Sequence, residues 1–294
     1  MRTVTSEIKP LSSEVVLDYR VFHARDEHFA YTVGMHYHEH YEIFLHECGG
    51  TRMVVGQSIY EMAPHELYLI PPFHIHGILT DSPLENYERS WVHITPSCLT
   101  VLGGSILSFP REIEHLTAGP VYRFPLSAQA FARLKGILCT VSTLSPDADR
   151  YERLRSRLVL SGFFNEICRL LSSSDSQSVT QRADSPIIQQ VLNYIAENCT
   201  EDLSLDRLAG RFNLSKYYLS HTFSKVYNVS TYRYILLCRI AKAQKLIRSG
   251  NLSLTEIAHQ CGFNDYSNFL RSFQHLVGLS PREYRNQQEQ DTHA

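Results

Sequence analysis

Four polar side chains in the first eighty residues have the types and the spacing of a binding site. His36 and His38 lie two residues apart, Glu42 follows four residues after His38, and His76 comes later in the chain. Residues i and i+2 of a β-strand project from the same face of the sheet. Imidazoles with one carboxylate suit divalent transition metals, and they also offer hydrogen-bond donors and acceptors to a polar small molecule. These residues therefore predict a polar site on one face of a sheet.

This spacing resembles the two motifs of the cupin superfamily of β-barrels. The H-x-H-x3-E-x6-G pattern from His36 to Gly49 is similar to the first motif, and the P-x-F-x2-H pattern that ends at His76 is similar to the second. Phe73 stands where cupins have glycine. The resemblance implies a small barrel. Three interpretations of the polar site stay open: a metal site, a metal-free pocket for a polar effector, and a structural remnant.

The residues predicted to bind an effector are His36, His38, Glu42, His76 and Trp91. Trp91 is the only tryptophan of the chain, and its ring could cover one face of a sugar or belong to the core. The chain has further histidines in this region, which weakens the match of any single histidine to a motif. They are His40, His46, His65, His74 and His93. Of these, His74 could take the place of His76 in the second motif.

A second set of candidate residues lies in a repeat near the C-terminal end. Residues 203–230 and 252–280 follow one plan, so that Ala209 matches Ala258 and Phe223 matches Phe273. Each copy has a serine N-cap, a short helix, a turn and a longer helix. This is the order of a helix-turn-helix unit, whose second helix enters the major groove of DNA.

The outward faces of the two longer helices carry the residues predicted to contact DNA. They are Lys216, Tyr217, Ser220, His221 and Lys225 in the first copy, and Tyr266, Ser267, Leu270 and Arg271 in the second. In a single copy, the same residues could simply form an ordinary solvent-exposed helix face. Two copies in fixed register, joined by one helix over 231–248, favour DNA binding. Ser220 and His221 are not long bidentate readers, which predicts weaker direct base contact by the first copy.

The stretch IAHQCGFNDYSNFLRSFQHLVGLSPREYR (257–285) resembles the signature of the AraC/XylS family of bacterial transcription activators, and the resemblance extends over 187–285. It implies that both recognition helices enter successive major-groove segments on one face of the DNA. Sensor domains of this family often keep the cupin pattern on a barrel that binds an effector without metal. We therefore expect a metal-free effector pocket and no cofactor.

The resemblance also implies a function and a set of partners. We expect an activator of a metabolic operon, most simply a carbohydrate operon, and not an enzyme. The expected partners are operator or promoter DNA, a sugar or related metabolite, RNA polymerase and a second copy of the chain. The alternative from another class is a metal-dependent cupin enzyme with an added DNA-binding half. It is disfavoured because Glu42 would serve as a ligand, and no second acidic pair lies nearby for acid–base catalysis.

The elements that hold these residues predict an α+β chain. Up to about residue 125 the pattern is β, with runs at 41–47, 57–62, 66–70 and 87–94 that read as a small antiparallel barrel or sandwich. Apolar residues spaced three and four positions apart then predict two helices, over 127–141 and 150–171, with a turn at 145–149. After a Ser-rich linker the chain is predicted to be all-helical, with two helix-turn-helix units. The expected domains are 1–172 for effector sensing and dimerisation, 173–185 as linker, and 186–294 for DNA binding.

The helix predicted over 150–171 has a broad apolar stripe. It comprises Leu154, Leu158, Val159, Phe163, Ile167, Leu170 and Leu171. The stripe is wider than packing on one barrel requires, so we expect part of it to form a homodimer interface.

Composition agrees with this reading. The chain has 294 residues, 43% hydrophobic and 20% charged, with a net charge of −2. Residues 1–183 carry a net charge of −4 and residues 184–285 a net charge of +4, an asymmetry that permits nucleic-acid binding without proving it. Seven scattered cysteines without a C-x-x-C motif predict reduced thiols. With no signal-like or membrane-spanning segment, we expect a cytoplasmic protein that does not contact a membrane.

Overall fold

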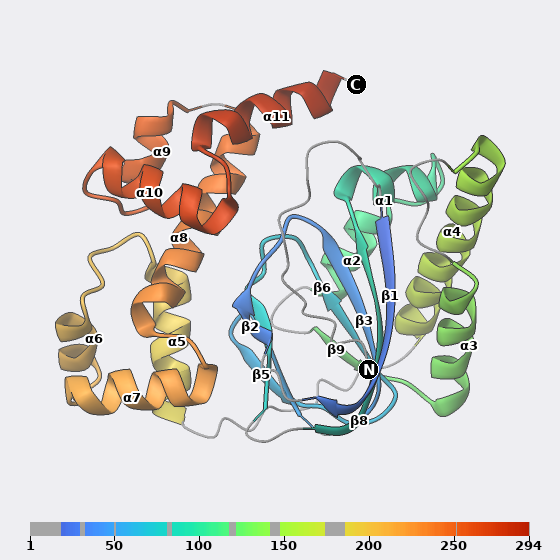
Figure 1. The fold of residues 1–294 in the computed structure, drawn as a ribbon, viewed down its shortest axis with the longest axis horizontal. Coiled ribbons are helices and arrows are strands. Elements are labelled where there is room, and N and C mark those ends of the chain that lie inside the picture. The colour runs from blue at the N-terminus through green and yellow to red at the C-terminus, as the bar shows by residue number, and fades with distance from the viewer. Residues whose placement is uncertain are drawn as a thin grey trace.

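The computed structural model describes residues 19–29, 33–49, 51–80, 84–117, 122–141, 148–173, 186–250 and 252–293. Within these ranges, a two-sheet β-structure with four helices on one side is followed by seven helices (Figure 1). The expected α+β architecture is confirmed. The predicted linker and most of the predicted turn at 145–149 lie outside the described residues. None of the described helices is long and apolar enough to cross a membrane.

Two antiparallel sheets form the barrel. The five-stranded sheet has the order β1 (Tyr19–Phe29), β8 (Leu84–Ile94), β3 (Tyr41–Cys48), β6 (Glu66–Ile70) and β9 (Arg123–Pro125). The four-stranded sheet has the order β2 (Val33–His36), β7 (His76–Leu79), β4 (Arg52–Val55) and β5 (Ser58–Glu61). The strands expected at 41–47, 57–62, 66–70 and 87–94 correspond to β3, β5, β6 and β8.

The five-stranded sheet buries both of its faces. Alternate residues such as Ile43, Leu45 and Val92 pack against the helices, while Phe44 and Tyr68 point into the barrel. The covering helices are α1 (Pro96–Gly103), α2 (Phe109–Leu116), α3 (Ala128–Cys139) and α4 (Arg150–Ser173). Helices α3 and α4 match the two predicted ones.

The expectation of β structure up to about residue 125 is wrong for α1 and α2. The physical reason lies in their starts. Pro96 occupies the first turn of α1, and the Thr95 side chain accepts a hydrogen bond from the Cys98 N–H, while Pro110 occupies the first turn of α2. Proline fixes a φ that suits the first helical turn and lacks an N–H that the turn would leave unpaired.

The apolar stripe of α4 divides into two parts. Phe163, Ile167 and Leu171 are buried in the core under the five-stranded sheet. Leu154 and Leu158 are instead 55% and 64% exposed. The first three turns of α4 therefore present apolar side chains that the described chain does not cover.

The helices described after residue 185 form two matching units around one long helix. They are α5 (Pro186–Asn198), α6 (Leu205–Arg211), α7 (Lys216–Tyr227), α8 (Thr231–Ser249), α9 (Leu254–Gln260), α10 (Tyr266–Val277) and α11 (Pro281–His293). Helix α8 runs between the unit of α6 and α7 and the unit of α9 and α10 (Figure 1). The helix predicted over 231–248 corresponds to α8, and its residues Ile240, Ala243 and Ile247 lie in the core of the second unit.

The turn inside each unit is built in the same way. The Leu214 N–H donates to the Ala209 carbonyl at 2.9 Å, and the Phe263 N–H donates to the Ala258 carbonyl at 3.0 Å. The residue before each donor has a left-handed backbone, with φ of 52° at Asn213 and 79° at Gly262. The repeat read from the sequence is therefore a repeat of structure.

The four-stranded sheet packs against the helical half. Its outward side chains, among them Met35, Val54 and Ile59, belong to one core cluster with Val191 and Leu192 of α5. Strands β2 and β5 lie beside α5 and α8 in Figure 1. One sheet of the barrel thus has the barrel interior on one side and the helical half on the other.

Candidate effector site and DNA-binding surface

The polar residues predicted from the sequence converge inside the barrel. The Glu42 Oε2 atom lies 2.8 Å from His38 Nε2 and 3.3 Å from His76 Nε2. The rings of His36 and His76 have centroids 4.3 Å apart. Strands β2, β3 and β7 and the β2–β3 connection bring the four residues together, and we call these four with His93 the histidine cluster.

His93 is the member of the cluster that motif spacing does not identify as a binding residue. Its Nε2 atom lies 3.0 Å from Glu42 Oε2. Glu42 and His93 are direct partners across the β3–β8 pair, and both project into the barrel. The register between strands β3 and β8 therefore identifies His93 as a member of the cluster. The alternating sequence around His93 does not determine that register.

Burial and hydrogen bonding act in opposite directions on Glu42. Burial alone would raise the pKa of its carboxyl group, but hydrogen bonds from His38, His76 and His93 outweigh it and hold that pKa well below the usual range. Burial, with the neighbouring His76, lowers the pKa of His36 to about 3. The cluster therefore contains an ionised carboxylate beside at least one neutral imidazole at neutral pH.

Trp91 belongs to a row of aromatic rings in the barrel. Phe22 stacks on it with ring centroids 4.9 Å apart, and Phe44 lies on the neighbouring strand with centroids 6.4 Å apart. Trp91 pairs directly with both residues across β1 and β3. This arrangement favours the packing role for Trp91 over an open face for a sugar ring.

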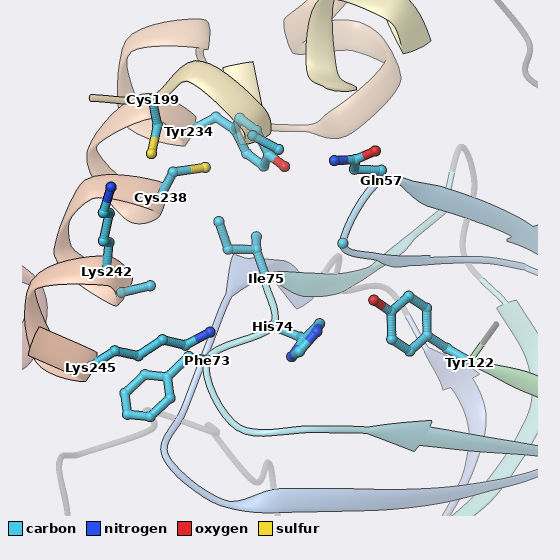
Figure 2. A pocket seen from close by; sticks show the side chains of 13 residues that line it. Gln57, Phe73, His74, Ile75, Tyr122, Cys199, Tyr234, Cys238, Lys242 and Lys245 are labelled. Carbon is cyan, nitrogen blue, oxygen red and sulfur yellow. The ribbon is translucent and has the colours of Figure 1, made fainter. Parts of the chain in front are cut away.

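His74 does not join the histidine cluster. It lines a cavity of about 520 Å³ between the barrel and the helical half, together with Tyr122 of the barrel and Tyr234, Lys242 and Lys245 of α8 (Figure 2). Phe73 and Ile75 also line this cavity. Residues 73–75 therefore face the cavity, whereas the next residue, His76, belongs to the histidine cluster.

The β2–β3 connection is tied directly to α8. Glu39 accepts hydrogen bonds from Gln244 Nε2 and Arg248 Nη2, each at 2.7 Å. The Arg248 guanidinium lies 5.5 Å from the centre of the Phe73 ring, a cation–π distance. Residues next to the histidine cluster are therefore also contacts of the helix that joins the two helix-turn-helix units.

The predicted DNA-binding residues of α7 form one exposed surface. Tyr217, Ser220, His221 and Lys225 line a surface hollow with Ser224. Tyr217 is 79% exposed, and its ring stacks on that of His221 with centroids 5.8 Å apart. Lys216 at the start of the helix forms an ion pair with Asp206.

Helix α10 divides its predicted residues by exposure. Ser267 and Arg271 are exposed, whereas Tyr266 and Leu270 are half-buried. Tyr266 packs on Phe269 with ring centroids 5.8 Å apart. Asn268 was not among the predicted residues, yet its Oδ1 accepts a hydrogen bond from Arg271 Nη2 at 2.5 Å.

Two family models match the chain. Residues 18–192 match the family model of the AraC-like ligand binding domain, and residues 208–287 match that of a helix-turn-helix domain. The HTH-type transcriptional regulator YijO of Escherichia coli is 31% identical over 46% of this chain and 47% of its own length. The melibiose operon regulatory protein of Escherichia coli is 29% identical over 63% of this chain and 64% of its own length.

Among solved structures, ToxT from Vibrio cholerae is 18% identical, over 91% of this chain and 98% of that chain, with a TM-score of 0.35. The chain spans about a third to a half of the length of the first curated relatives it matches. The ligand-binding-domain match alone covers more than half of this chain, and the helix-turn-helix match spans both units. The chain belongs to the AraC/XylS family of bacterial transcription regulators.

Proposed function

We propose that this regulator activates a metabolic operon, most simply a carbohydrate operon, when a small polar effector binds inside the barrel at the histidine cluster. The melibiose operon regulatory protein, one of the relatives of this chain, supports the carbohydrate assignment. Imidazoles and a carboxylate supply both hydrogen-bond donors and hydrogen-bond acceptors. Each hydroxyl group of a polyhydroxylated molecule can pair with one of each.

The position of the cluster on a sheet with two packed faces carries this proposal. His36 and His76 belong to β2 and β7, whereas their neighbours Met35 and Ile75 pack in the cluster shared with α5. A molecule that moves these strands therefore also changes the contacts between the four-stranded sheet and the helical half. It regulates transcription only if it binds one arrangement of the two halves more tightly than another.

DNA recognition is assigned to α7 and α10. Their exposed residues, Tyr217, Ser220, His221, Ser267 and Arg271, face away from the cores of their units. We propose that the two helices enter successive major-groove segments about 34 Å apart, one turn of B-DNA. Lys216 and Lys225 at the ends of α7 are suited to phosphate contacts.

The active form is proposed to be a homodimer that recruits RNA polymerase. The exposed apolar residues Tyr151, Leu154 and Leu158 at the start of α4 support a second copy of the chain as the partner. Large exposed apolar groups on one helix face are typical of interaction surfaces.

The effector assignment is tested with the full chain and two matched variants. A thermal-shift screen against sugars and organic acids identifies the molecule that raises the melting temperature, since a ligand at 100 times its Kd stabilises by about 2.7 kcal/mol. Glu42→Gln should abolish this shift and the reporter response while operator binding stays intact. Glu47→Gln is the control, because Glu47 contacts Lys135 of α3 on the opposite side of the sheet. A full response in Glu42→Gln would remove the cluster as the effector site.

A further inference from the structure

We infer that α7 recognises the C5-methyl group of thymine in its segment of the operator, through the exposed rings of Tyr217 and His221. The inference deepens the proposed function, because it rests on the assignment of DNA recognition to α7 and α10 and names the base that one of these helices selects. It also makes the two segments of the operator different in sequence.

The two rings lie where a recognition helix meets the bases. Tyr217 is the second residue of α7, and the residues near the start of such a helix contact base edges in the major groove. The side chain of Tyr217 is exposed, and the exposed His221 follows four residues later on the same face of the helix. The planes of the two rings differ by only 14°, so stacking holds them together as one flat aromatic surface.

Packing of α7 within its own unit does not account for these rings. The residues that α7 buries are Leu219, Phe223 and Tyr227, which lie on the opposite side of the helix. A tyrosine buries about 150–250 Å² when it is covered, and contiguous exposed groups of this kind mark interaction surfaces. Tyr217 therefore offers this area to a partner outside the chain, which on a recognition helix is DNA.

The other side chains of α7 do not supply the usual hydrogen-bonding pairs with bases. Arg or Lys pairs with guanine, Asn or Gln pairs with adenine, and Asp or Glu pairs with cytosine. The sequence of α7, KYYLSHTFSKVY, has no Arg, Asn, Gln, Asp or Glu. Of its two lysines, Lys216 is ion-paired with Asp206, and Lys225 lies in the last turn, away from the end that meets the base edges.

Thymine is the base that suits an aromatic surface. Its C5-methyl group is the apolar group that the four bases present in the major groove. Ser220 and Ser224 line the surface hollow of α7 together with the two rings. Serine side chains are short, so the rings project beyond them and meet a methyl group first. The rings of Tyr217 and His221 therefore cover a thymine methyl group when α7 lies in the groove.

Helix α10 carries different side chains at the matching positions. Ser267 takes the place of Tyr217. Arg271 takes the place of His221, and its Nη2 atom donates a hydrogen bond to Asn268 Oδ1. An arginine suits guanine, whose O6 and N7 atoms accept its N–H groups. Because the two helices select different bases, the protein binds its operator in one orientation.

The experiment is a thymine-to-uracil scan of an operator that the full chain selects from random DNA. Uracil lacks only the C5-methyl group, so each replacement removes an apolar contact and leaves every hydrogen-bonding group in place. The segment of α7 is the one in which Arg271→Ala leaves the base preference unchanged. There, one uracil should weaken wild-type binding about fourfold, since one buried methyl group is worth about 0.8 kcal/mol. In Tyr217→Ala most of this difference should disappear.

Two further variants separate the ring of Tyr217 from its other properties. Tyr217→Phe keeps the ring and loses the hydroxyl group, so it should keep the fourfold difference. Tyr232→Ala removes an exposed tyrosine of α8, and it should keep the difference as well. Melting temperatures show whether each variant is folded. An unchanged difference in folded Tyr217→Ala, or its loss in Tyr217→Phe, would overturn the inference.

Failure of this inference and failure of the proposed function give different results. If selection enriches a sequence with two contacted segments but no uracil replacement weakens wild-type binding, the thymine inference falls and DNA recognition by the two helices stands. If selection enriches no sequence, recognition by α7 and α10 falls, and the thymine inference falls with it.

Discussion

Arg271 is the side chain most suited to direct base readout. It is exposed on α10, and its guanidinium is held by Asn268, which limits the entropy lost on binding. Arg271→Ala should cost about 1–3 kcal/mol at one base-pair position, measured by operator binding with single base substitutions.

Lys216→Ala is the comparison for Arg271→Ala, because a phosphate contact carries no sequence information. It should weaken all sequences alike and reduce the slope of binding against salt by about one. An Arg271→Ala variant that also lost affinity evenly across all substituted operators would contradict base readout by this residue.

Gly262 is the residue that the second unit's turn depends on most. Its φ is +79°, and an added Cβ would lie 2.4 Å from the Thr200 carbonyl oxygen. Gly262→Ala should lower the free energy of unfolding by about 3 kcal/mol or more, because strain and a backbone clash add. Gly210→Ala is the control, since nothing lies within 4 Å of its added Cβ, and it should stabilise α6 by up to about 1 kcal/mol. Urea unfolding of both variants decides, and equal stabilities would contradict the argument.

At the residue scale, local spacing predicted much of the site. His36, His38 and Glu42 lie within seven residues, so strand geometry alone places them near one another. His93 required the β3–β8 register, and the orientation of Trp91 required its pairing with Phe22. Those contacts join segments far apart in the chain, and short-range patterns do not specify them.

At the scale of elements, the β2–β3 connection and α8 form the link between the two halves. The Glu39 contacts to Gln244 and Arg248 hold this link. Glu39→Gln should accelerate hydrogen exchange in α8, by no more than about fivefold, because a partly exposed ion pair is worth about 0.2–1 kcal/mol.

The control for the link is Glu47→Gln, whose side chain contacts α3 instead. It should leave α8 exchange unchanged, and mass spectrometry of peptides from 236–249 gives the comparison. Identical exchange in Glu39→Gln and wild type would show that the contact does not hold α8.

Element prediction succeeded where apolar periodicity was long and failed where it was short. Helices α3 and α4 and the two helix-turn-helix units had clear periods or caps, such as the capping box of Ser253 and Glu256. Strand β1 has no regular alternation, since Arg25, Asp26 and Glu27 are consecutive charged residues, and β2 and β7 have four residues each. Their pairing with distant strands, and the packing of the four-stranded sheet on α5, are tertiary contacts that local propensity does not reveal.

At the scale of the whole molecule, the start of α4 determines the expected assembly. Leu158→Glu places a charge in the proposed dimer interface and should weaken dimerisation at least tenfold, which is about 1.4 kcal/mol. Tyr232→Glu, at an exposed residue of α8, should leave it unchanged. Sedimentation equilibrium measures both, and a wild-type chain that is monomeric at tens of micromolar would contradict the dimer.

DNA recognition by two helix-turn-helix units is the central claim, and hydroxyl-radical footprinting of the full chain tests it most directly. Duplexes are first selected by the protein from a random pool, and the bound sites are then footprinted. The account predicts an enriched sequence with two contacted segments centred about 10–10.5 base pairs apart on one face of the helix. No enrichment over random DNA, or protection of a single segment, would contradict it.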